Sequence, residues 1–289
     1  MAETRVGVLG ATGMVGQGLL PLLTKAGRQV IAYSRQDRPR SGQVEFRRLY
    51  LPDGDPGSEQ IADWVCLAPI WTLPEHFKML AGHRAERIVA LSSTSVFTKQ
   101  GSSDPAEQQT AAKLARGERE LIAWAEANGI EWLILRPTLI YGKGQDRNIG
   151  EIARFISRFS FFPLLGQAKG LRQPVHADDV AAACAAALLK RNVRNRTYEL
   201  SGAERLSYRE MVARVFKTMG KQERFIPIPL WLFGAAIVCL RLLPRYRHWS
   251  AAMAERMNID LVFEHTEASS DLGFSPRPFR LGSNDLPSE

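Results

Sequence analysis

The first forty positions alternate between short apolar runs and a stretch with helical periodicity. Residues 5–9 form an apolar run, a glycine-containing turn follows, and apolar positions then recur at the spacing of one helix face. A second apolar run covers residues 29–35. The pattern predicts a strand, a loop, a helix and a second strand, which is how a parallel α/β sheet begins.

The same alternation continues through the first half of the chain. Residues 44–55 and 62–71 predict a third and a fourth strand, and the short segment between them predicts an irregular connection instead of a full crossover helix. Residues 73–97 predict a helix and a fifth strand, 107–127 a helix, and 130–142 a sixth strand. Strands that alternate with helices predict a doubly wound parallel sheet of the Rossmann type.

The second half of the chain has a different pattern. Residues 143–289 predict a smaller, mostly helical lobe that covers the substrate, and the alanine-rich stretch 173–190 returns to the core. Residues 1–142 therefore form the dinucleotide-binding domain. The aromatic-rich segment 155–165 is interpreted as the core of the lobe, with a wall for an apolar substrate as the alternative.

Three glycines lie at the first strand–helix junction, where a dinucleotide-binding loop needs them. Gly10 allows the tight turn, Gly13 lets the backbone approach a pyrophosphate, and Gly16 allows close packing of the helix. The amides and dipole at the start of the helix favour phosphate oxygens. The residues predicted to contact the cofactor follow the carboxyl ends of the strands: Gly10, Thr12, Gly13, Met14, Val15, Gly16, Ser34, Arg35, Leu67, Ala68, Pro69, Ser92, Pro137 and Thr138.

The end of the second strand indicates which dinucleotide is bound. NAD sites usually place a carboxylate there for the ribose hydroxyls, whereas NADP sites place an arginine near the 2′-phosphate. This chain has Ser34 and Arg35 at the strand end, Arg38 and Arg40 close behind, and Asp37 only after the strand. The sequence predicts NADP(H) as the preferred cofactor, with NAD(H) as the alternative. A solvated arginine loop is the non-functional interpretation.

Four motifs occur in a characteristic order: "GATGMVG", "LSSTSVF", "LRPTLIYG" and "QPVHADDVAAA". In this order the chain resembles extended and atypical short-chain dehydrogenases/reductases, the NAD-dependent epimerase/dehydratase family. The region beyond residue 200 resembles the atypical members related to the accessory subunit of respiratory complex I. The resemblance implies an NAD(P)-binding Rossmann fold and an oxidoreductase or epimerase/dehydratase activity. The implied substrate is a nucleotide-sugar or a hydrophobic, lipid-linked small molecule.

By this resemblance Ser93 is the catalytic serine, whose hydroxyl bonds the substrate oxygen. The family then has a tyrosine, with a lysine four residues later, on the next helix; a nearby ammonium lowers the pKa of the phenol so that it exchanges a proton near neutral pH. This sequence departs from that pattern. Lys113 has Gln109 at the tyrosine position, and a register set by the glutamates gives Ala112 and Arg116 instead.

Three interpretations of the chemistry follow. The protein is an enzyme in which Lys113, Lys99, Tyr141 or a water handles the proton; or it binds NADP(H) without turnover, as a sensor or assembly subunit; or hydride transfer alone suffices. The enzyme is favoured by a small margin, with Ser93, Lys113 and Tyr141 as the candidate catalytic residues. The pattern indicates neither a metal cluster nor a Ser-His-Asp triad.

The net charge of +8 is compatible with several anionic partners. Few aromatic residues are interleaved with the basic ones, which argues against nucleic acid. The amino-terminal strand leaves no room for a signal peptide, so a cytoplasmic protein is expected. Cys66, Cys184 and Cys239 have apolar neighbours and predict buried, reduced thiols. A small-molecule substrate is the expected partner, and a homo-oligomer is left open.

The stretch from 229 to 249 has an unusual composition. Its apolar run is shorter than the roughly 20 residues that a bilayer-spanning helix needs. A buried helix is the first interpretation. The alternative is an interfacial helix with Trp231 and Trp249 as anchors and arginines facing anionic headgroups, which predicts peripheral membrane contact.

Overall fold

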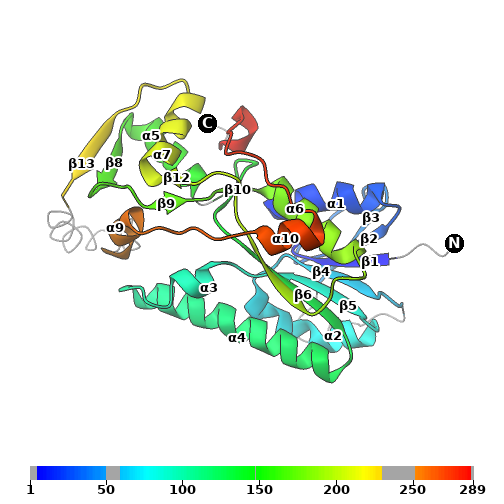
Figure 1. The fold of residues 1–289 in the computed structure, drawn as a ribbon. Helices are drawn as coiled ribbons and strands as arrows, with labels where there is room; N and C mark the ends of the chain where they lie inside the picture. Colours follow the sequence, from blue (N-terminus) through cyan, green and yellow to red (C-terminus); the bar gives the residue numbers. More distant parts are fainter. Residues whose placement is uncertain (1–4, 50–58, 147, 230–250, 288–289) are drawn as a thin grey trace.

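The computed structural model describes residues 5–49, 59–146, 148–229 and 251–287, and its centre is a seven-stranded sheet in the order β11-β6-β5-β4-β1-β2-β3 (Figure 1). Every neighbouring pair in this sheet is parallel. This is the Rossmann-type α/β fold that the sequence predicts. The strands are β1 (Arg5–Leu9), β2 (Gln29–Ser34), β3 (Val44–Arg48), β4 (Asp63–Cys66), β5 (Arg87–Leu91), β6 (Glu131–Pro137) and β11 (Arg196–Leu200).

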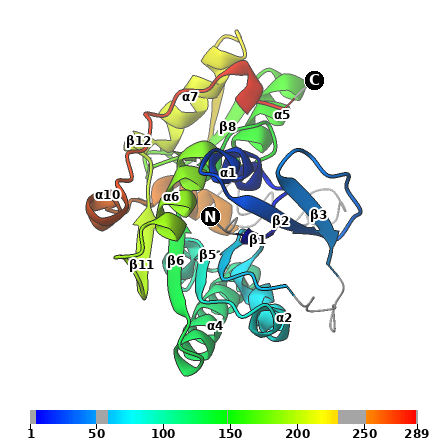
Figure 2. The same cartoon turned by 90° about the vertical axis from the view of Figure 1, so that its right-hand side faces the viewer.

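Helices cover both faces of the sheet (Figure 2). The helices α1 and α6 pack on one face, and α2 and α4 lie on the other. β5 is buried along its whole length, because its side chains enter the two cores alternately. The helices around the sheet are α1 (Met14–Lys25), α2 (Phe77–Gly82), α3 (Ser95–Thr98), α4 (Pro105–Ala127), α6 (Ala177–Leu189) and α10 (Thr266–Leu272), with the 3₁₀ turn η1 (Ile70–His76). The 3₁₀ turn η3 (Ser283–Asp285) lies beside the second lobe (Figure 1).

The seventh strand differs from the sequence expectation, which placed these residues in the second lobe. β11 pairs in parallel with β6, from Arg196 opposite Leu133 to Leu200 opposite Pro137. Tyr198 and Leu200 enter the core, whereas Thr197 and Glu199 on the other face are only partly buried, as in a half-buried edge strand. The segment was missed because it is short and contains two charged residues, Arg196 and Glu199, among its five. The connection between β3 and β4 includes residues 50–58, which lie outside the described part of the chain.

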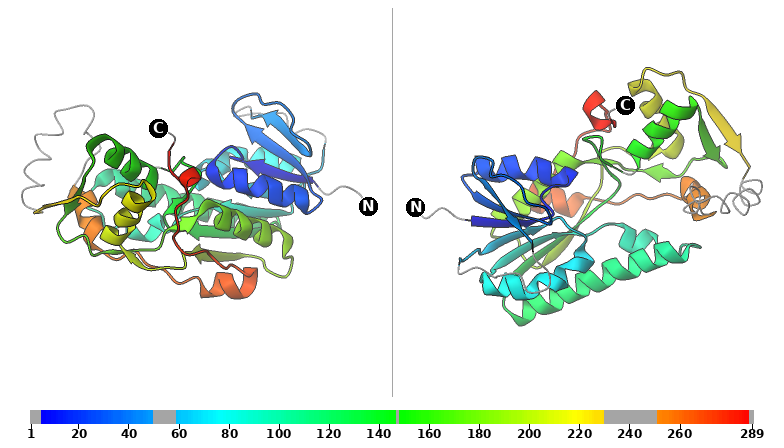
Figure 3. Two further views of the ribbon diagram at one scale, coloured as in Figure 1. Left: turned by 90° about the horizontal axis from the view of Figure 1, so that it is seen from above. Right: turned by 180° about the vertical axis from the view of Figure 1, so that it is seen from behind.

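The second lobe sits beyond one end of the sheet (Figure 3). In its described part the helices are accompanied by three small two-stranded sheets, β10-β7, β12-β9 and β13-β8, which add strands to a lobe predicted to be mostly helical. Its core includes Phe162, Leu164 and Leu165, as predicted, whereas Phe159 is 43% exposed. The elements are β7 (Ile140–Tyr141), α5 (Ile149–Phe159), β8 (Phe162–Leu165), β9 (Leu171–Arg172), β10 (Val175–His176), β12 (Leu206–Ser207), α7 (Tyr208–Thr218), β13 (Phe225–Ile228) and α9 (Ala251–Asn258).

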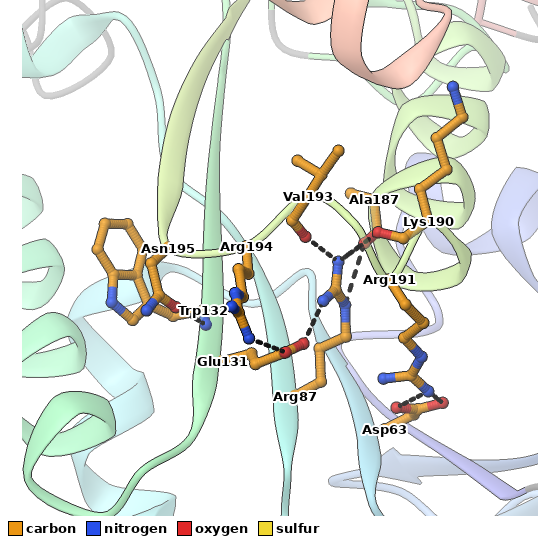
Figure 4. A network of polar contacts seen from close by, with 10 residues as sticks. All are labelled: Asp63, Arg87, Glu131, Trp132, Ala187, Lys190, Arg191, Val193, Arg194 and Asn195. Atoms are coloured by element: carbon orange, nitrogen blue, oxygen red, sulfur yellow. Dashed lines mark hydrogen bonds and ion pairs between the residues drawn. The ribbon is translucent and has the colours of Figure 1, made fainter.

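A buried arginine joins the amino ends of the strands to the end of α6 (Figure 4). Arg87, the first residue of β5, has no exposed surface, and its guanidinium donates to the carbonyl oxygens of Ala187 (2.6 Å), Val193 (2.6 Å) and Lys190 (3.0 Å). Its remaining arm pairs with Glu131 of β6. The carbonyls at the carboxyl end of a helix lack partners within the helix, so Arg87 supplies both the hydrogen bonds and the favourable charge.

Two predictions, on the cysteines and on membrane contact, can be compared with the structure. Cys66 and Cys184 are buried free thiols, as predicted, and burial raises the pKa of each to about 12. Among the described residues, none of the helices has the length and apolarity to cross a membrane. The interfacial helix considered for residues 229–249, and Cys239 within it, lie outside the described residues apart from Pro229. Membrane contact there stays a prediction.

Candidate cofactor cleft

A cleft of about 380 Å³ opens where the sequence places the dinucleotide, at the carboxyl ends of β1, β4 and β5. Ligands of doubly wound sheets bind at this end of the strands. It is called the cleft below. Its lining consists of Gly10, Gly13, Met14, Val15, Gly16, Leu67, Ala68, Pro69, Ile70, Trp71, Leu91, Ser92, Ser93, Ser95, Thr110, Leu114 and Ile140, none of which is charged.

The glycine turn between β1 and α1 leaves no space for side chains. Gly10 has a φ of +77°, and a Cβ there would lie 2.6 Å from the amide nitrogen of Ala68 in the neighbouring loop. A Cβ on Gly16 would lie 2.1 Å from the carbonyl oxygen of Ala11, so Gly16 packs closely against the glycine turn that precedes α1. No side chain caps α1 at Gly13. Its first-turn amides are therefore oriented for a phosphate, which fits a dinucleotide.

The helix α4 begins at two residues that favour the start of a helix. Asp104 accepts a hydrogen bond from the amide of Ala106 (2.9 Å), and Pro105 takes the first helical position. The residues that α4 presents to the cleft are Thr110 and Leu114, four residues apart on one face. This is the spacing at which the resemblance implies a tyrosine and a lysine, in a register that differs from both alternatives considered above.

The side chains of α4 that face the cleft have no proton to give. The hydroxyl of Thr110 donates to the carbonyl oxygen of Ala106 in the preceding turn (2.9 Å), and Leu114 is apolar. Lys113, predicted as a catalytic candidate, is exposed and is not part of the lining. One residue along a helix is a rotation of about 100°, which carries Lys113 away from the cleft.

Two serines after β5 have different hydrogen bonds. The Oγ atom of Ser93 accepts a bond from the amide of Ser95 (3.1 Å), which leaves the hydroxyl proton of Ser93 for an oxygen in the cleft. The hydroxyl of Ser92 donates to Glu118 of α4 (2.5 Å). Ser93 therefore lies in the lining of the cleft with a hydroxyl proton that no described residue accepts, and its catalytic role stays a prediction.

Glu118 lies behind Ser92 and is paired in turn with Arg136 of β6. The guanidinium donates to both carboxylate oxygens, at 2.9 and 2.6 Å, and Glu118 is only 5% exposed. Arg136 also contacts Glu199 of β11 at 3.2 Å. A bidentate pair of this kind fixes α4 against the sheet and neutralises the carboxylate.

The other candidate proton donors lie outside the lining. Tyr141 has no exposed surface and packs edge-on against His176 and Phe279, and burial raises its pKa to about 12. Lys99 contacts Glu107 at 3.7 Å. Burial, followed by the charge of Arg256, lowers the pKa of Lys99. The structure does not bring Tyr141 or Lys113 together with Ser93.

Several predicted contact residues surround the cleft without lining it. Thr12 and Arg35 are exposed, and the Oγ atom of Ser34 accepts a bond from the amide of Gln36. The carbonyl of Pro137 accepts a bond from Thr94, and the hydroxyl of Thr138 donates to Gln173. The lining also includes residues that sequence reasoning missed: Ile70, Trp71, Leu91, Ser95, Thr110, Leu114 and Ile140. Of these, Ile70 and Trp71 directly follow a predicted contact residue and could have been found on that ground.

The fold and the glycine turn are those of Rossmann-type dinucleotide-binding proteins. The chain matches the model of the NAD dependent epimerase/dehydratase family over residues 75–201. It is a distant homologue of the mitochondrial NADH dehydrogenase [ubiquinone] 1 alpha subcomplex subunit 9 of Arabidopsis thaliana, with 27% identity over 77% of this chain and 60% of the relative.

Two further proteins are similar to this chain. An uncharacterized protein of Sinorhizobium fredii is 30% identical over 66% of this chain and 50% of its own length. The chain thus spans about half the length of the curated relatives it matches. MoeE5, solved in complex with UDP-glucuronic acid and NAD, has a TM-score of 0.72 at 21% identity and covers 97% of this chain and 95% of its own.

Proposed function

We propose that this protein binds a nicotinamide dinucleotide as a held ligand and does not carry out the proton transfer of its enzymatic relatives. The main observation in support of this proposal is which residues of α4 line the cleft. Thr110 and Leu114, which have the spacing of the family's tyrosine and lysine but a different register, are the residues of α4 that line the cleft, and the hydroxyl of Thr110 is bonded within the helix. The similarity to a protein named as a subunit of NADH dehydrogenase supports a binding role within a larger assembly.

A second candidate function is an enzyme that works without the phenol. The observation in its favour is Ser93, whose hydroxyl proton remains available for a substrate oxygen. Solved relatives bound to UDP-sugars support a nucleotide-sugar as the substrate class. The apolar lining favours a hydrophobic small molecule instead.

A binding and turnover experiment separates the two functions. Purified protein is expected to bind NADPH or NADH in calorimetry. Supplied with that cofactor and with UDP-glucose or UDP-glucuronic acid, it is expected to give no product and no change in cofactor absorbance. Ser93→Ala, which removes one hydroxyl, is expected to leave cofactor affinity within about twofold, less than the worth of one hydrogen bond. If the wild-type protein forms product and Ser93→Ala forms none, the protein is an enzyme and the proposal of binding without turnover is refuted.

We further propose that NADP(H) is the preferred dinucleotide. Arg35 is exposed at the end of β2, and Asp37 pairs with Arg48 at 3.2 Å, so this carboxylate is engaged elsewhere. Arg35→Ala is expected to weaken NADPH binding by about 1–3 kcal/mol, the worth of a charge-assisted hydrogen bond, and to leave NADH binding unchanged. Calorimetric titration of both dinucleotides measures this. Equal weakening of NADPH and NADH would contradict the preference.

A further inference from the structure

The order of the strands determines how a dinucleotide extends through the cleft. The glycine turn after β1 lies between β2 on one side and β4 and β5 on the other. With the diphosphate at this turn, an adenosine half that reaches Ser34 and Arg35 extends toward β2. The nicotinamide half then extends the opposite way, past the ends of β4 and β5 to α4.

The wall at that end of the cleft is uncharged. Leu91, Ile140 and Leu114 supply apolar surface, and the hydroxyls of Thr110 and Ser92 are donated to protein acceptors. These two hydroxyls therefore offer no donated proton to a ligand.

The carboxylate behind Ser92 does not change this picture. Both oxygens of Glu118 receive hydrogen bonds from the guanidinium of Arg136, so this carboxylate has an adjacent counter-charge. Arg136 also pairs with Glu199 of β11, which is not part of the lining. Ser93 retains one hydroxyl proton, which suits an oxygen acceptor and not a cation. No described residue of the lining offers a negative charge to a ligand.

We infer that the cleft selects the reduced form of the dinucleotide over the oxidised form, an inference that rests on the proposed binding function. The nicotinamide ring carries a positive charge when oxidised and none when reduced. Moving a cation from water against an apolar wall without a counter-charge is unfavourable, whereas the neutral ring loses nothing electrostatic there. With such selectivity, the amount of dinucleotide bound to the protein depends on the ratio of reduced to oxidised dinucleotide in its surroundings.

Calorimetric titration of the wild-type protein gives the first test. NADPH, NADP⁺ and 2′-phospho-ADP-ribose are titrated, with NADH, NAD⁺ and ADP-ribose in parallel, so that the comparison does not depend on the phosphate preference. The expected result is that the reduced form binds about tenfold more tightly than the oxidised form. The ribose compounds lack only the nicotinamide ring, so they report on the binding of the rest of the dinucleotide.

Variants at Leu114 then test the electrostatic cause. Leu114→Glu places a carboxylate on the wall and is expected to bring the ratio of oxidised to reduced dissociation constants close to one. Leu114→Gln has the same shape without the charge and is expected to keep the wild-type ratio. Arg116→Gln makes the same change in net charge on the exposed side of α4 and is also expected to keep it. Unchanged binding of the ribose compounds shows that each variant is folded.

The outcomes separate this inference from the proposed function. If no dinucleotide and no ribose compound binds, the binding function itself is refuted. Equal affinities for the oxidised and reduced forms refute the redox selectivity and leave the binding function standing. Tighter binding of the oxidised form also refutes it, and identifies the indole face of Trp71, which lines the cleft, as a site of cation–π attraction. A ratio that falls equally in Leu114→Glu and Leu114→Gln overturns the charge explanation.

Discussion

Replacing Arg87 with methionine is expected to lower the free energy of unfolding by about 3–5 kcal/mol, because one change removes the partner of several buried groups. The carbonyl oxygens of Ala187, Lys190 and Val193 would lose their shared donor, and Glu131 would lose its buried counter-ion. Unsatisfied buried polar groups are costly even where the new side chain fits. Urea denaturation followed by circular dichroism measures the loss.

Arg194 provides the matched control for this prediction. Its side chain is 69% exposed and approaches the same Glu131 at 3.7 Å (Figure 4). Arg194→Met is expected to change the free energy of unfolding by about 0.5 kcal/mol or less, since exposed ion pairs contribute little. Similar losses in both variants would show that the three carbonyls, in the last turn of α6 and the segment that follows it, do not depend on Arg87.

The second large effect is expected at the glycine turn. Gly10→Ala is expected to weaken dinucleotide binding on the order of a hundredfold, a loss of about 3 kcal/mol. The added Cβ would lie 2.6 Å from a backbone atom of Ala68, at a φ of +77°. The loop must therefore move, and the amides that face a diphosphate move with it. Calorimetry with NADPH and NADH measures the change.

Gly27 separates backbone strain from loss of the site. It has a φ of +74°, close to that of Gly10, but a Cβ there would meet no atom within 4 Å, and it lies at the far end of α1. Gly27→Ala is expected to cost about 1 kcal/mol of stability and to leave the dinucleotide dissociation constant unchanged. If both alanine variants weaken binding equally, strain and not the shape of the turn explains the loss.

The parts of the fold that sequence predicted are those that local pattern determines. The sequence predicted β1, the glycine turn and α1 because each depends only on residues that are neighbours in the chain. These are the apolar run that ends at Leu9, the three spaced glycines and the helical periodicity that follows them. The serine after β5 could be predicted as a cleft residue for the same reason, and its catalytic role stays a prediction. Ser93 lies at the carboxyl end of an apolar strand, where the edge of a parallel sheet gathers its ligand-binding loops.

The face that α4 presents to the cleft could not be read in the same way. The helix was predicted as residues 107–127 and is observed as Pro105–Ala127, so its existence was secure. Its rotation depends on tertiary contacts, above all the pairing of Glu118 with Arg136 and Ser92. A shift of one residue exchanges the exposed Lys113 for the cleft-lining Leu114. β11 was missed for a related reason, since an edge strand is identified by its partner strand.

The strand β5 begins at the Arg87 network and ends at Leu91 in the cleft, so the two sites are separated by four residue steps along a strand, about 13 Å. Sites at this separation that share no partner usually act additively. Saturating dinucleotide should therefore raise the melting temperature of the wild-type protein and of a network variant by similar increments. Substitutions at the cleft end of the sheet can then change the ligand preference without changing the thermal stability that the Arg87 network provides at the other end.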